Sequence, residues 1–337
     1  MKKSLRILQS LTAAMALLTI LYTSNIPVSA NELTLAEIVQ LSTMYTYDEL
    51  QNDINELQLY YPDIVSVSSI GTTALGKDIY CITLGNQDAE HNIMIQSTVH
   101  AREYPASQVT MKMVEYYCQY NITNPLFLQS VCFYIVPMAN PDGVDIAQFG
   151  TAHLTDTATI NFVKSQGHTK DWKANAMGVD INRNFDVGWS QLKSPYNSPS
   201  YMRYKGAYAT SEAETIALVN LATARNYDCY ISYHMQGNLI YYDEPGNTKE
   251  VSSLSTDLAK TIASINHYRL VNLKSAINGT DVQQGGFTDW VQLALGKPAC
   301  TVELGSALPP TVQGSVAKIY ENNKNTWFLV ALNYLNF

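Results

Sequence analysis

The chain has 337 residues, of which 46% are hydrophobic, and its 29 acidic residues outnumber its 21 basic ones to give a net charge of −8. A chain of this length can bury about three quarters of its unfolded surface in one large domain. The acidic balance argues against a nucleic-acid partner, because binding to phosphates needs a basic surface.

The first thirty residues have the layout of a secretory signal peptide. Lys2, Lys3 and Arg6 precede an apolar run at 11–21, and small residues lead up to Ala30. We predict cleavage after Ala30, which indicates a secreted bacterial protein, extracellular or in the cell wall. The alternative is a membrane anchor, but the apolar run is about half of the roughly 20 residues that cross a bilayer. Without the signal, 18 basic residues (21 minus 3) against 29 acidic ones give a charge of −11, and we expect no stable membrane insertion.

The five cysteines are an odd number, and most lie in apolar, strand-like runs: Cys81, Cys118, Cys132, Cys229 and Cys300. A small buried hydrophobic side chain accounts for cysteine in such a context. We therefore assign no disulfide bond.

Residues 31–43 form a short lead-in that is too brief to hold a core, and we expect one domain over 44–337. Apolar residues recur at helical spacing from Tyr45 and stop before Pro62, which predicts an amphipathic helix. Four hydrophobic runs then predict β-strands: residues 65–70, 79–84, 92–98 and 131–136.

A helix is predicted over 106–120, and Asn140-Pro141-Asp142-Gly143 predicts a turn after the strand at 131–136. The stretches 147–180 and 186–209 are polar, aromatic and without periodicity, so we expect long surface loops. Loops of that length in a compact domain are usually functional.

Ser211 and Glu214 have the spacing of a capping box and predict a helix that ends near Arg225. The strand at 229–233 then ends at His234. Three more elements are expected: a helix at 252–265, a strand at 300–303 and a closing helix near 316–334. Strands that alternate with helices predict a single α/β domain, with a mixed, mostly parallel sheet covered by helices on both faces.

Polar side chains that suit zinc lie at the predicted strand ends. His100 and Glu103 are three residues apart, and His234 ends a separate strand. A catalytic zinc needs three protein ligands and an open position, and ligands of open α/β sheets bind beyond the carboxyl ends of the strands. The alternative is that Glu103 simply favours the start of a helix. Glu303 also ends a strand, where it either serves catalysis or forms a structural ion pair.

The chain resembles the zinc carboxypeptidases of the carboxypeptidase A type, from about Tyr45 to the C-terminus. Five motifs in order carry the resemblance: Val99-His100-Ala101-Arg102-Glu103, Asn140-Pro141-Asp142-Gly143, Gly178-Val179-Asp180-Ile181-Asn182-Arg183-Asn184, Ser232-Tyr233-His234 and Thr301-Val302-Glu303. The resemblance implies one Zn²⁺ ion held by His100, Glu103 and His234. Two histidines and one glutamate are the known zinc ligands of carboxypeptidase A.

The resemblance also implies a role for each remaining site residue. Glu303 would act as general base and acid, and Asp180 would orient a ligand histidine. Arg102 and Lys173 would stabilise the oxyanion. Asn182 and Arg183 would clamp a substrate carboxylate.

Two positions depart from the digestive enzymes of the family. Lys173 stands where those enzymes have an arginine, so that a compact ammonium group replaces a planar guanidinium group. Asp281 stands where they carry a mobile tyrosine. Tyr241 and Tyr242 are near His234 in the sequence and are possible sources of a replacement.

The residues around Lys173 are similar to the bacterial branch that cleaves γ-D-glutamyl-diaminopimelate bonds in peptidoglycan peptides. In this interpretation Arg183 meets a carboxylate of diaminopimelate and Thr288 lies at the floor of the pocket. The leading hypothesis is a secreted metallopeptidase acting on peptidoglycan stem peptides. Two alternatives stay open: a general metallocarboxypeptidase that trims ordinary peptides, and a catalytically silent module that binds peptides or wall fragments.

Overall fold

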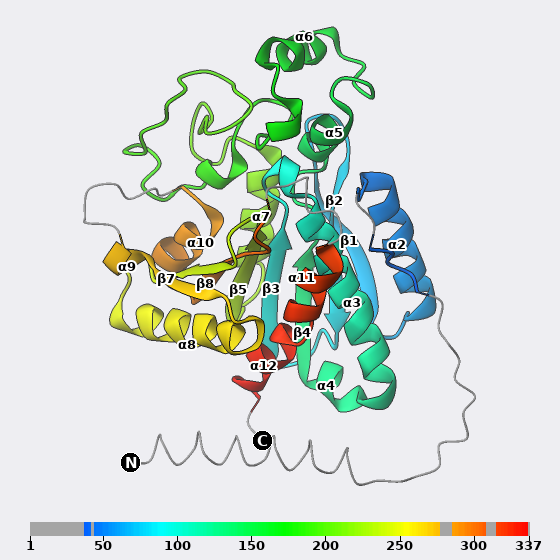
Figure 1. Ribbon diagram of the computed structural model, residues 1–337. Helices are drawn as coiled ribbons and strands as arrows, with labels where there is room; N and C mark the ends of the chain where they lie inside the picture. The colour runs from blue at the N-terminus through cyan, green and yellow to red at the C-terminus, as the bar shows by residue number, and fades with distance from the viewer. Residues whose placement is uncertain (1–36, 42–43, 277–284, 308–314, 336–337) are drawn as a thin grey trace. The chain divides into compact units, whose positions relative to one another are not determined.

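A mixed β-sheet runs through the computed structural model, which describes residues 37–41, 44–276, 285–307 and 315–335 (Figure 1). Within these residues the sheet has eight strands in the order β1-β2-β4-β3-β5-β8-β6-β7. The strands are β1 (Val65–Thr72), β2 (Asp78–Gly85), β3 (His91–Ser97), β4 (Val131–Val136), β5 (Cys229–His234), β6 (Leu239–Tyr242), β7 (Arg269–Asn272) and β8 (Ala299–Glu303).

The centre of the sheet is parallel and its flanks are mixed. Strands β4, β3, β5 and β8 pair in parallel, whereas β1–β2, β2–β4 and β6–β8 pair antiparallel. Strand β7 returns to a parallel pairing with β6. The predicted single α/β domain with a mixed, mostly parallel sheet is therefore confirmed.

Helices cover both faces of the sheet. The longer ones are α2 (Tyr47–Tyr60), α3 (Pro105–Thr123), α4 (Pro125–Ser130), α5 (Pro141–Phe149), α6 (Thr157–Gln166), α7 (Ala213–Thr223), α8 (Lys249–Asn266), α11 (Val316–Asn323) and α12 (Thr326–Leu332). Single turns or short helices are η1 (Ala101–Glu103), η2 (Thr169–Asp171), η3 (Ile181–Arg183), α9 (Leu273–Ala276), α10 (Phe287–Trp290) and η4 (Val291–Leu295).

Side-chain alternation along the strands explains the two layers of helices. In β3, Ile93 and Ile95 pack into the cluster that includes α2, α3, α8, α11 and α12, whereas Met94 packs into the cluster with α7 and α10. Successive strand residues point to opposite faces, so a strand buried on both sides reads as a continuous hydrophobic run. This is why the central strands were visible in the sequence.

The motif Asn140-Pro141-Asp142-Gly143 begins a helix, and the predicted turn is wrong. Asn140 is the N-cap of α5, where its side chain accepts a hydrogen bond from the Gly143 backbone N–H at 3.0 Å. Proline at the first helical position suits such a start, because its fixed φ is helical and its missing N–H has no partner there in any case. Turn and helix-start residues overlap, and the sequence pattern did not separate them.

Three further boundaries differ from the expectation. Helix α6 interrupts the loop predicted at 147–180, and Val163 is its one buried residue, which leaves no periodicity to detect. Glu212 rather than Ser211 precedes α7, and the Ser211 hydroxyl hydrogen-bonds Glu212 instead. The single closing helix is two helices, α11 and α12, with a break after Asn323.

The described part of the lead-in is attached to α3. The backbone N–H groups of Ile38 and Val39 donate to the carboxylate of Glu115 at 2.9 and 3.2 Å, and Val39 is fully buried. The signal peptide predicted at 1–30 lies outside the described residues. All five cysteines are buried and free.

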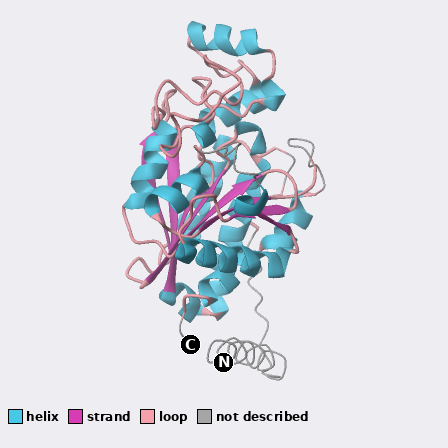
Figure 2. Ribbon diagram, turned by 90° about the vertical axis from the view of Figure 1, so that its left-hand side faces the viewer, coloured by secondary structure: helices cyan, strands magenta, loops and turns pink. Residues whose placement is uncertain are grey.

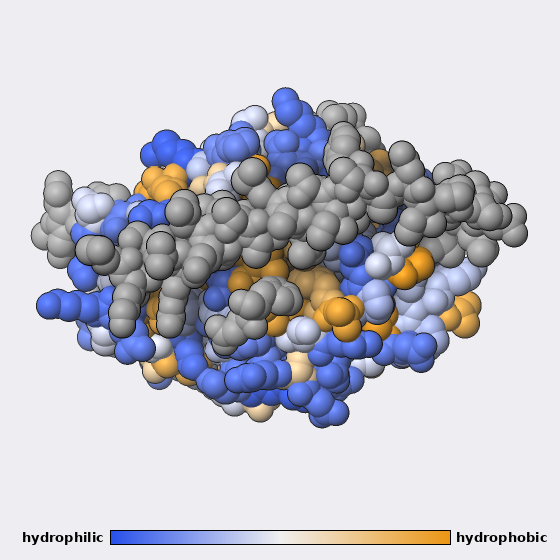
Figure 3. All heavy atoms as spheres, turned by 90° about the horizontal axis from the view of Figure 1, so that it is seen from below, coloured by the Kyte–Doolittle hydropathy of each residue, from blue (hydrophilic) through white to orange (hydrophobic). Residues whose placement is uncertain are grey.

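Among the described residues, no helix is both long and apolar enough to cross a membrane. The surface seen in Figure 3 is largely hydrophilic, with hydrophobic side chains in separate groups. Exposed hydrophobic side chains dispersed in this way are normal for a folded protein.

Candidate metal centre

Three neighbouring parallel strands end at one edge of the sheet, and each delivers a polar side chain there. His100 follows β3, His234 is the last residue of β5, and Glu303 is the last residue of β8. His234 and Glu303 stand directly opposite each other in the register of β5 and β8. Figures 1 and 2 show the long loops between α5 and α7 at this end of the sheet.

Two histidines and one glutamate converge on a common point. The Nδ1 atoms of His100 and His234 are 3.2 Å apart, and Glu103 places Oε1 3.1 Å from His100 Nδ1 and Oε2 3.1 Å from His234 Nδ1. A tetrahedral zinc ion with bonds of about 2.1 Å separates its ligands by about 3.4 Å. The three groups therefore have nearly the spacing that a zinc ion imposes, and they form the only such cluster found among the described residues.

Asp180 sets the tautomer of the first histidine. Its Oδ1 lies 3.2 Å from Nε2 of His100, and its Oδ2 accepts a hydrogen bond from the Arg203 backbone N–H at 3.0 Å. With the ring proton on Nε2, the Nδ1 atom presents a lone pair toward His234 and Glu103. A carboxylate that orients a ligand histidine in this way is typical of metal sites.

Two groups at the centre, Glu103 and His234, have protonation states that suit a metal ligand. Burial opposes ionisation of Glu103, but Lys173 and His100 outweigh it and hold the pKa of Glu103 well below its ordinary value. Burial lowers the pKa of His234, so this ring is neutral near pH 7. An ionised carboxylate beside a neutral imidazole nitrogen is the donor set that Zn²⁺ takes.

Glu303 differs electrostatically from Glu103. Burial, followed by the charge of Glu103, raises the pKa of Glu303 to about 8, against the effects of His100 and Lys173. Two carboxyl groups close together, one ionised and one that holds a proton more tightly, are the arrangement by which sites divide acid and base roles. A zinc ion would add positive charge and lower the pKa of Glu303, which makes the carboxylate available as a base near neutral pH.

Lys173 and Arg102 reach this region from neighbouring loops. The ammonium group of Lys173 lies 3.1 Å from Oε1 of Glu103, so it belongs to the centre. Arg102 forms an ion pair with Asp171 at 3.3 Å, and the Asp171 side chain is 60% exposed. Backbone bonds from Ala101 and Arg102 to the segment at 172–173 hold the two loops together.

The residues predicted to hold a substrate carboxylate lie on η3, which follows Asp180. The Asn182 side chain accepts a hydrogen bond from the Phe287 backbone N–H at 3.0 Å, which joins η3 to α10. Nε of Arg183 is 3.6 Å from the carboxylate of Asp180. Thr288 of α10 is buried and bonds Thr301 of β8. Asp281 lies outside the described residues.

The sequence did not indicate which residues support the loop that carries Lys173 and Asp180. The Tyr201 carbonyl accepts from the backbone N–H groups of both Lys173 and Ala174, and the Tyr204 carbonyl accepts from Asp180. These bonds are made by backbone atoms, so no residue type marks them in the sequence. Thr301 lies two residues before Glu303 on β8, so its side chain is on the same face of the sheet.

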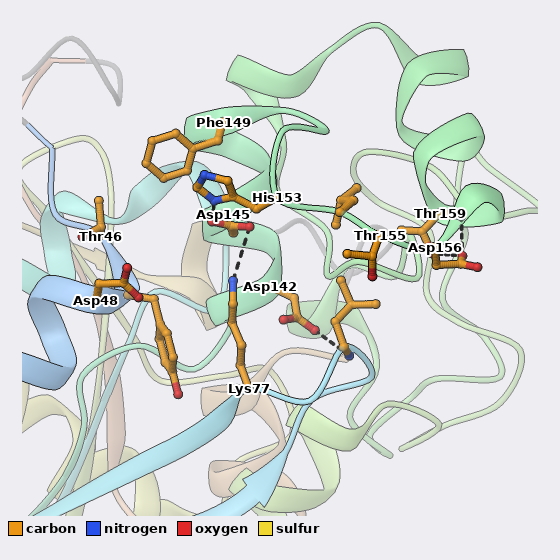
Figure 4. Close-up of a pocket in the computed structure, with 13 residues that line it drawn as sticks. Thr46, Asp48, Lys77, Asp142, Asp145, Phe149, His153, Thr155, Asp156 and Thr159 are labelled. Carbon is orange, nitrogen blue, oxygen red and sulfur yellow. Dashed lines mark hydrogen bonds and ion pairs between the residues drawn. The ribbon is translucent and has the colours of Figure 1, made fainter.

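A separate hollow of about 270 Å³ lies between α2, the β1–β2 turn and α5 (Figure 4). None of the predicted metal-binding, catalytic or substrate-binding residues lines it. Its polar groups are used within the protein: Asp145 pairs with Lys77 and His153, and Asp142 accepts from the Leu75 backbone N–H. This hollow therefore contributes nothing to the metal chemistry.

An α/β sheet with two histidines and a glutamate beyond its parallel strand ends, beside a further carboxylate, defines a metal-dependent hydrolase. A family model described as zinc carboxypeptidase matches residues 50–328. The chain belongs to the zinc carboxypeptidase family, whose members use one Zn²⁺ ion, and it is a peptidase that acts on peptide substrates.

The names of individual relatives state two kinds of activity. The chain is 28% identical over 293 residues to gamma-D-glutamyl-L-diamino acid endopeptidase 1 of Lysinibacillus sphaericus, a match that covers 82% of this chain and 69% of the relative. It is 27% identical over 274 residues to carboxypeptidase B of Astacus astacus, with 78% and 86% covered. Bovine thrombin-activatable fibrinolysis inhibitor has the same fold, with a TM-score of 0.70 at 20% identity over 88% of this chain and 98% of that one.

Proposed function

We propose that the protein is a secreted metallopeptidase that hydrolyses the γ-D-glutamyl-meso-diaminopimelate amide bond of peptidoglycan stem peptides. The observation that carries the peptidase chemistry is the placement of Glu303 directly opposite His234 in the register of neighbouring strands. The substrate assignment rests on the sequence motifs around Lys173 and on the similarity to an enzyme named for γ-D-glutamyl-diamino acid bonds.

In this proposal His100, Glu103 and His234 hold the zinc ion, and Asp180 keeps Nδ1 of His100 free to bind it. The ion supplies Lewis acidity and lowers the pKa of water to about 7. Glu303 removes a proton from the attacking water and returns it to the leaving amine.

Four cationic or amide side chains act on the substrate. Lys173 and Arg102 stabilise the negative charge that develops on the scissile carbonyl oxygen. Lys173 lies 3.1 Å from Glu103, whereas Arg102 forms an ion pair with Asp171. Asn182 and Arg183 bind the carboxylate of the residue that is released, Arg183 through two parallel hydrogen bonds.

A general metallocarboxypeptidase is the second candidate, because the similarity to a carboxypeptidase B extends over a comparable part of the chain. Both candidates use the same metal, base and clamp. They differ only in the substrate residue that the pocket accepts and in the linkage that is cut.

The test uses the zinc-loaded protein that begins at residue 31. Incubation with L-Ala-γ-D-Glu-meso-diaminopimelate should release diaminopimelate, with products identified by mass spectrometry and with release abolished by a chelator. Glu303→Gln should keep zinc and slow the reaction by about 10²- to 10⁴-fold. Release of C-terminal residues from an α-linked peptide alone would support the second candidate. No product from either substrate would support the silent binding module.

Secretion is part of the proposal and rests on the residues before Ala30. Expression of the full chain in a Gram-positive host should give extracellular protein that begins at Asn31. Full-length protein retained in the cells would contradict it.

A further inference from the structure

The loops beside the metal centre are basic, although the protein as a whole is acidic. Residues 164–205 contain seven basic and three acidic residues, whereas the whole chain has 21 basic and 29 acidic ones. A local excess of one charge attracts ligands of the opposite charge. These loops therefore favour an anionic substrate. The seven basic residues are Lys164, Lys170, Lys173, Arg183, Lys193, Arg203 and Lys205.

The segment that contains Arg203 runs along the metal centre. Two residues before Arg203, the Tyr201 carbonyl accepts a hydrogen bond from the backbone N–H of Lys173. The backbone N–H of Arg203 itself donates to Oδ2 of Asp180 at 3.0 Å, and the other oxygen of Asp180 lies beside the ring of His100. The backbone of Arg203 is therefore fixed directly behind a proposed metal ligand.

Arg203 has a backbone conformation that favours glycine. Its φ is +63°, in the left-handed region that residues with a side chain rarely adopt. The Ser194 hydroxyl donates to its carbonyl at 2.7 Å, so both backbone polar groups of Arg203 are bonded. Residues held in this region cluster at ligand-binding sites. The backbone at this position does not require arginine, so the side chain needs an explanation of its own.

The guanidinium group of Arg203 is a cation with no acidic partner. Its side chain is exposed, and no carboxylate of the described residues forms an ion pair with it. The other cations of the site differ in this respect, since Lys173, Arg102 and Arg183 lie 3.1, 3.3 and 3.6 Å from carboxylate oxygens. Arg203 is thus the cation of the site that is available to bind an anion from outside the protein.

The charge of Arg203 acts on the side of the site that carries Arg102. Partial burial and a hydrogen bond with Tyr196 raise the pKa of the Tyr201 phenol, the charge of Asp171 adds to this shift, and the charge of Arg203 opposes it. Asp171 pairs with Arg102 at 3.3 Å. The guanidinium of Arg203 therefore lies toward this ion pair, whereas the proposed clamp for the released residue lies on η3.

A γ-linked glutamyl residue carries a charge that an α-linked residue lacks at the same place. Its side-chain carboxyl group forms the amide bond that is cut, so its α-carboxylate stays free on the amino side of that bond. Asn182 and Arg183 are assigned to the carboxylate on the other side. A free carboxylate suits a guanidinium group, which can bind both of its oxygens through two parallel hydrogen bonds.

We propose that Arg203 binds the free α-carboxylate of the γ-linked glutamyl residue and thereby selects γ-linked over α-linked substrates. This inference rests on the proposed function, since it names the group that recognises the residue before the scissile bond. Arg203 contributes its guanidinium group and leaves the metal ligands and Glu303 unchanged.

The experiment uses two tripeptides that differ at one group: L-Ala-γ-D-Glu-meso-diaminopimelate and its analogue with the glutamyl α-carboxylate converted to a carboxamide. We expect zinc-loaded wild type to have about tenfold higher kcat/KM on the carboxylate form, the size of one hydrogen bond to a charged group. Arg203→Gln should lose about tenfold on the carboxylate form and nothing on the carboxamide form, with unchanged zinc content.

Lys193→Gln is the matched control. It removes an exposed positive charge from the residue next to Ser194, which contacts the backbone of Arg203, and it should keep the wild-type preference. An equal loss with Lys193→Gln would mean that the basic loop acts only through its total charge, and would overturn the inference. Equal losses on both tripeptides with Arg203→Gln, or no loss on either, would also overturn it.

Arg203→Gly provides a second variant in case glutamine does not tolerate the left-handed backbone, because glycine suits this conformation. It should show the same loss on the carboxylate form alone. Agreement between the two variants separates the role of the guanidinium group from an effect on the backbone.

Calorimetric binding of both tripeptides to zinc-loaded Glu303→Gln, with and without Arg203→Gln, tests the subsite without cleavage. A preference for the carboxylate form that Arg203→Gln removes, together with no cleavage by wild type, would overturn the proposed function and support the subsite. Cleavage of the γ-linked tripeptide without such a preference would overturn the inference and leave the proposed function in place.

Discussion

Glu214 is a buried acid behind the loop that carries Asp180. The side-chain amide of Asn175 donates to Glu212 at 2.7 Å and to Glu214 at 3.1 Å, while its carbonyl accepts from the backbone of Val179. Burial raises the pKa of Glu214 from 4.5 to about 7, although its hydrogen bonds oppose the shift. The loop that forms the site is therefore anchored to a carboxyl group that prefers to stay protonated.

Replacing this acid with its neutral isostere should change how stability depends on pH. Because the folded-state pKa is above the unfolded one, the wild type is most stable relative to Glu214→Gln below about pH 4.5. It loses that advantage as the pH rises through 7, by at most about 3 kcal/mol. Urea unfolding of the wild type and of Glu214→Gln at pH 5 and pH 8 measures this stability difference. A stability difference that does not change between these pH values would show that Glu214 is ionised in the folded protein.

Helix α2 illustrates an element whose start is specified locally. The Thr46 hydroxyl accepts from the Glu49 backbone N–H at 3.1 Å, and the Glu49 carboxylate accepts from the Thr46 backbone N–H, which completes a capping box. Leu50, Ile54 and Leu57 then bury one face of the helix. Local bonds and helical spacing agree, so this helix was predictable from the sequence.

Thr46→Ala should lower the free energy of unfolding by about 1 kcal/mol, since the alanine side chain cannot accept the capping hydrogen bond. Thr46→Ser keeps the hydroxyl and should remain within a few tenths of the wild type. Denaturant titrations of the three proteins give the comparison. An alanine variant as stable as the serine variant would mean that the cap adds nothing here.

Elements that depend on distant contacts were harder to predict. The candidate metal ligands could be named because His100, Glu103 and His234 are chemically distinctive and follow hydrophobic strands. The Asn140 helix start was misassigned because the same residues suit turns. The support that Tyr201 gives to Lys173 was invisible because backbone atoms make it.

Across the whole molecule, we expect metal binding and folding to be coupled. The ligands come from segments far apart in the sequence, so the unfolded chain offers no comparable site. A ligand that binds only the folded state stabilises it by about 4 kcal/mol at a thousand times its dissociation constant.

Zinc should therefore raise the melting temperature of the metal-free protein by several degrees, and a chelator should reverse the effect. Calorimetry with increasing zinc measures this shift. His234→Ala should abolish it. His153→Ala, an exposed histidine paired with Asp145 outside the centre, should retain it. A shift that survives His234→Ala would place the stabilising ion elsewhere.

Strand β8 lies between β5 and β6 in the sheet, although both of those strands precede it in the chain. As a ribosome makes the protein from its N-terminus, β5 and β6 emerge before the strand that lies between them, β8, has been made. The sheet therefore cannot close until β8 has been made, and contacts of such long sequence separation form slowly. The same late strand brings Glu303, so a nascent chain carries all three proposed metal ligands before it has a base. A chain that stops before β8 would thus lack the carboxylate that the proposed reaction needs.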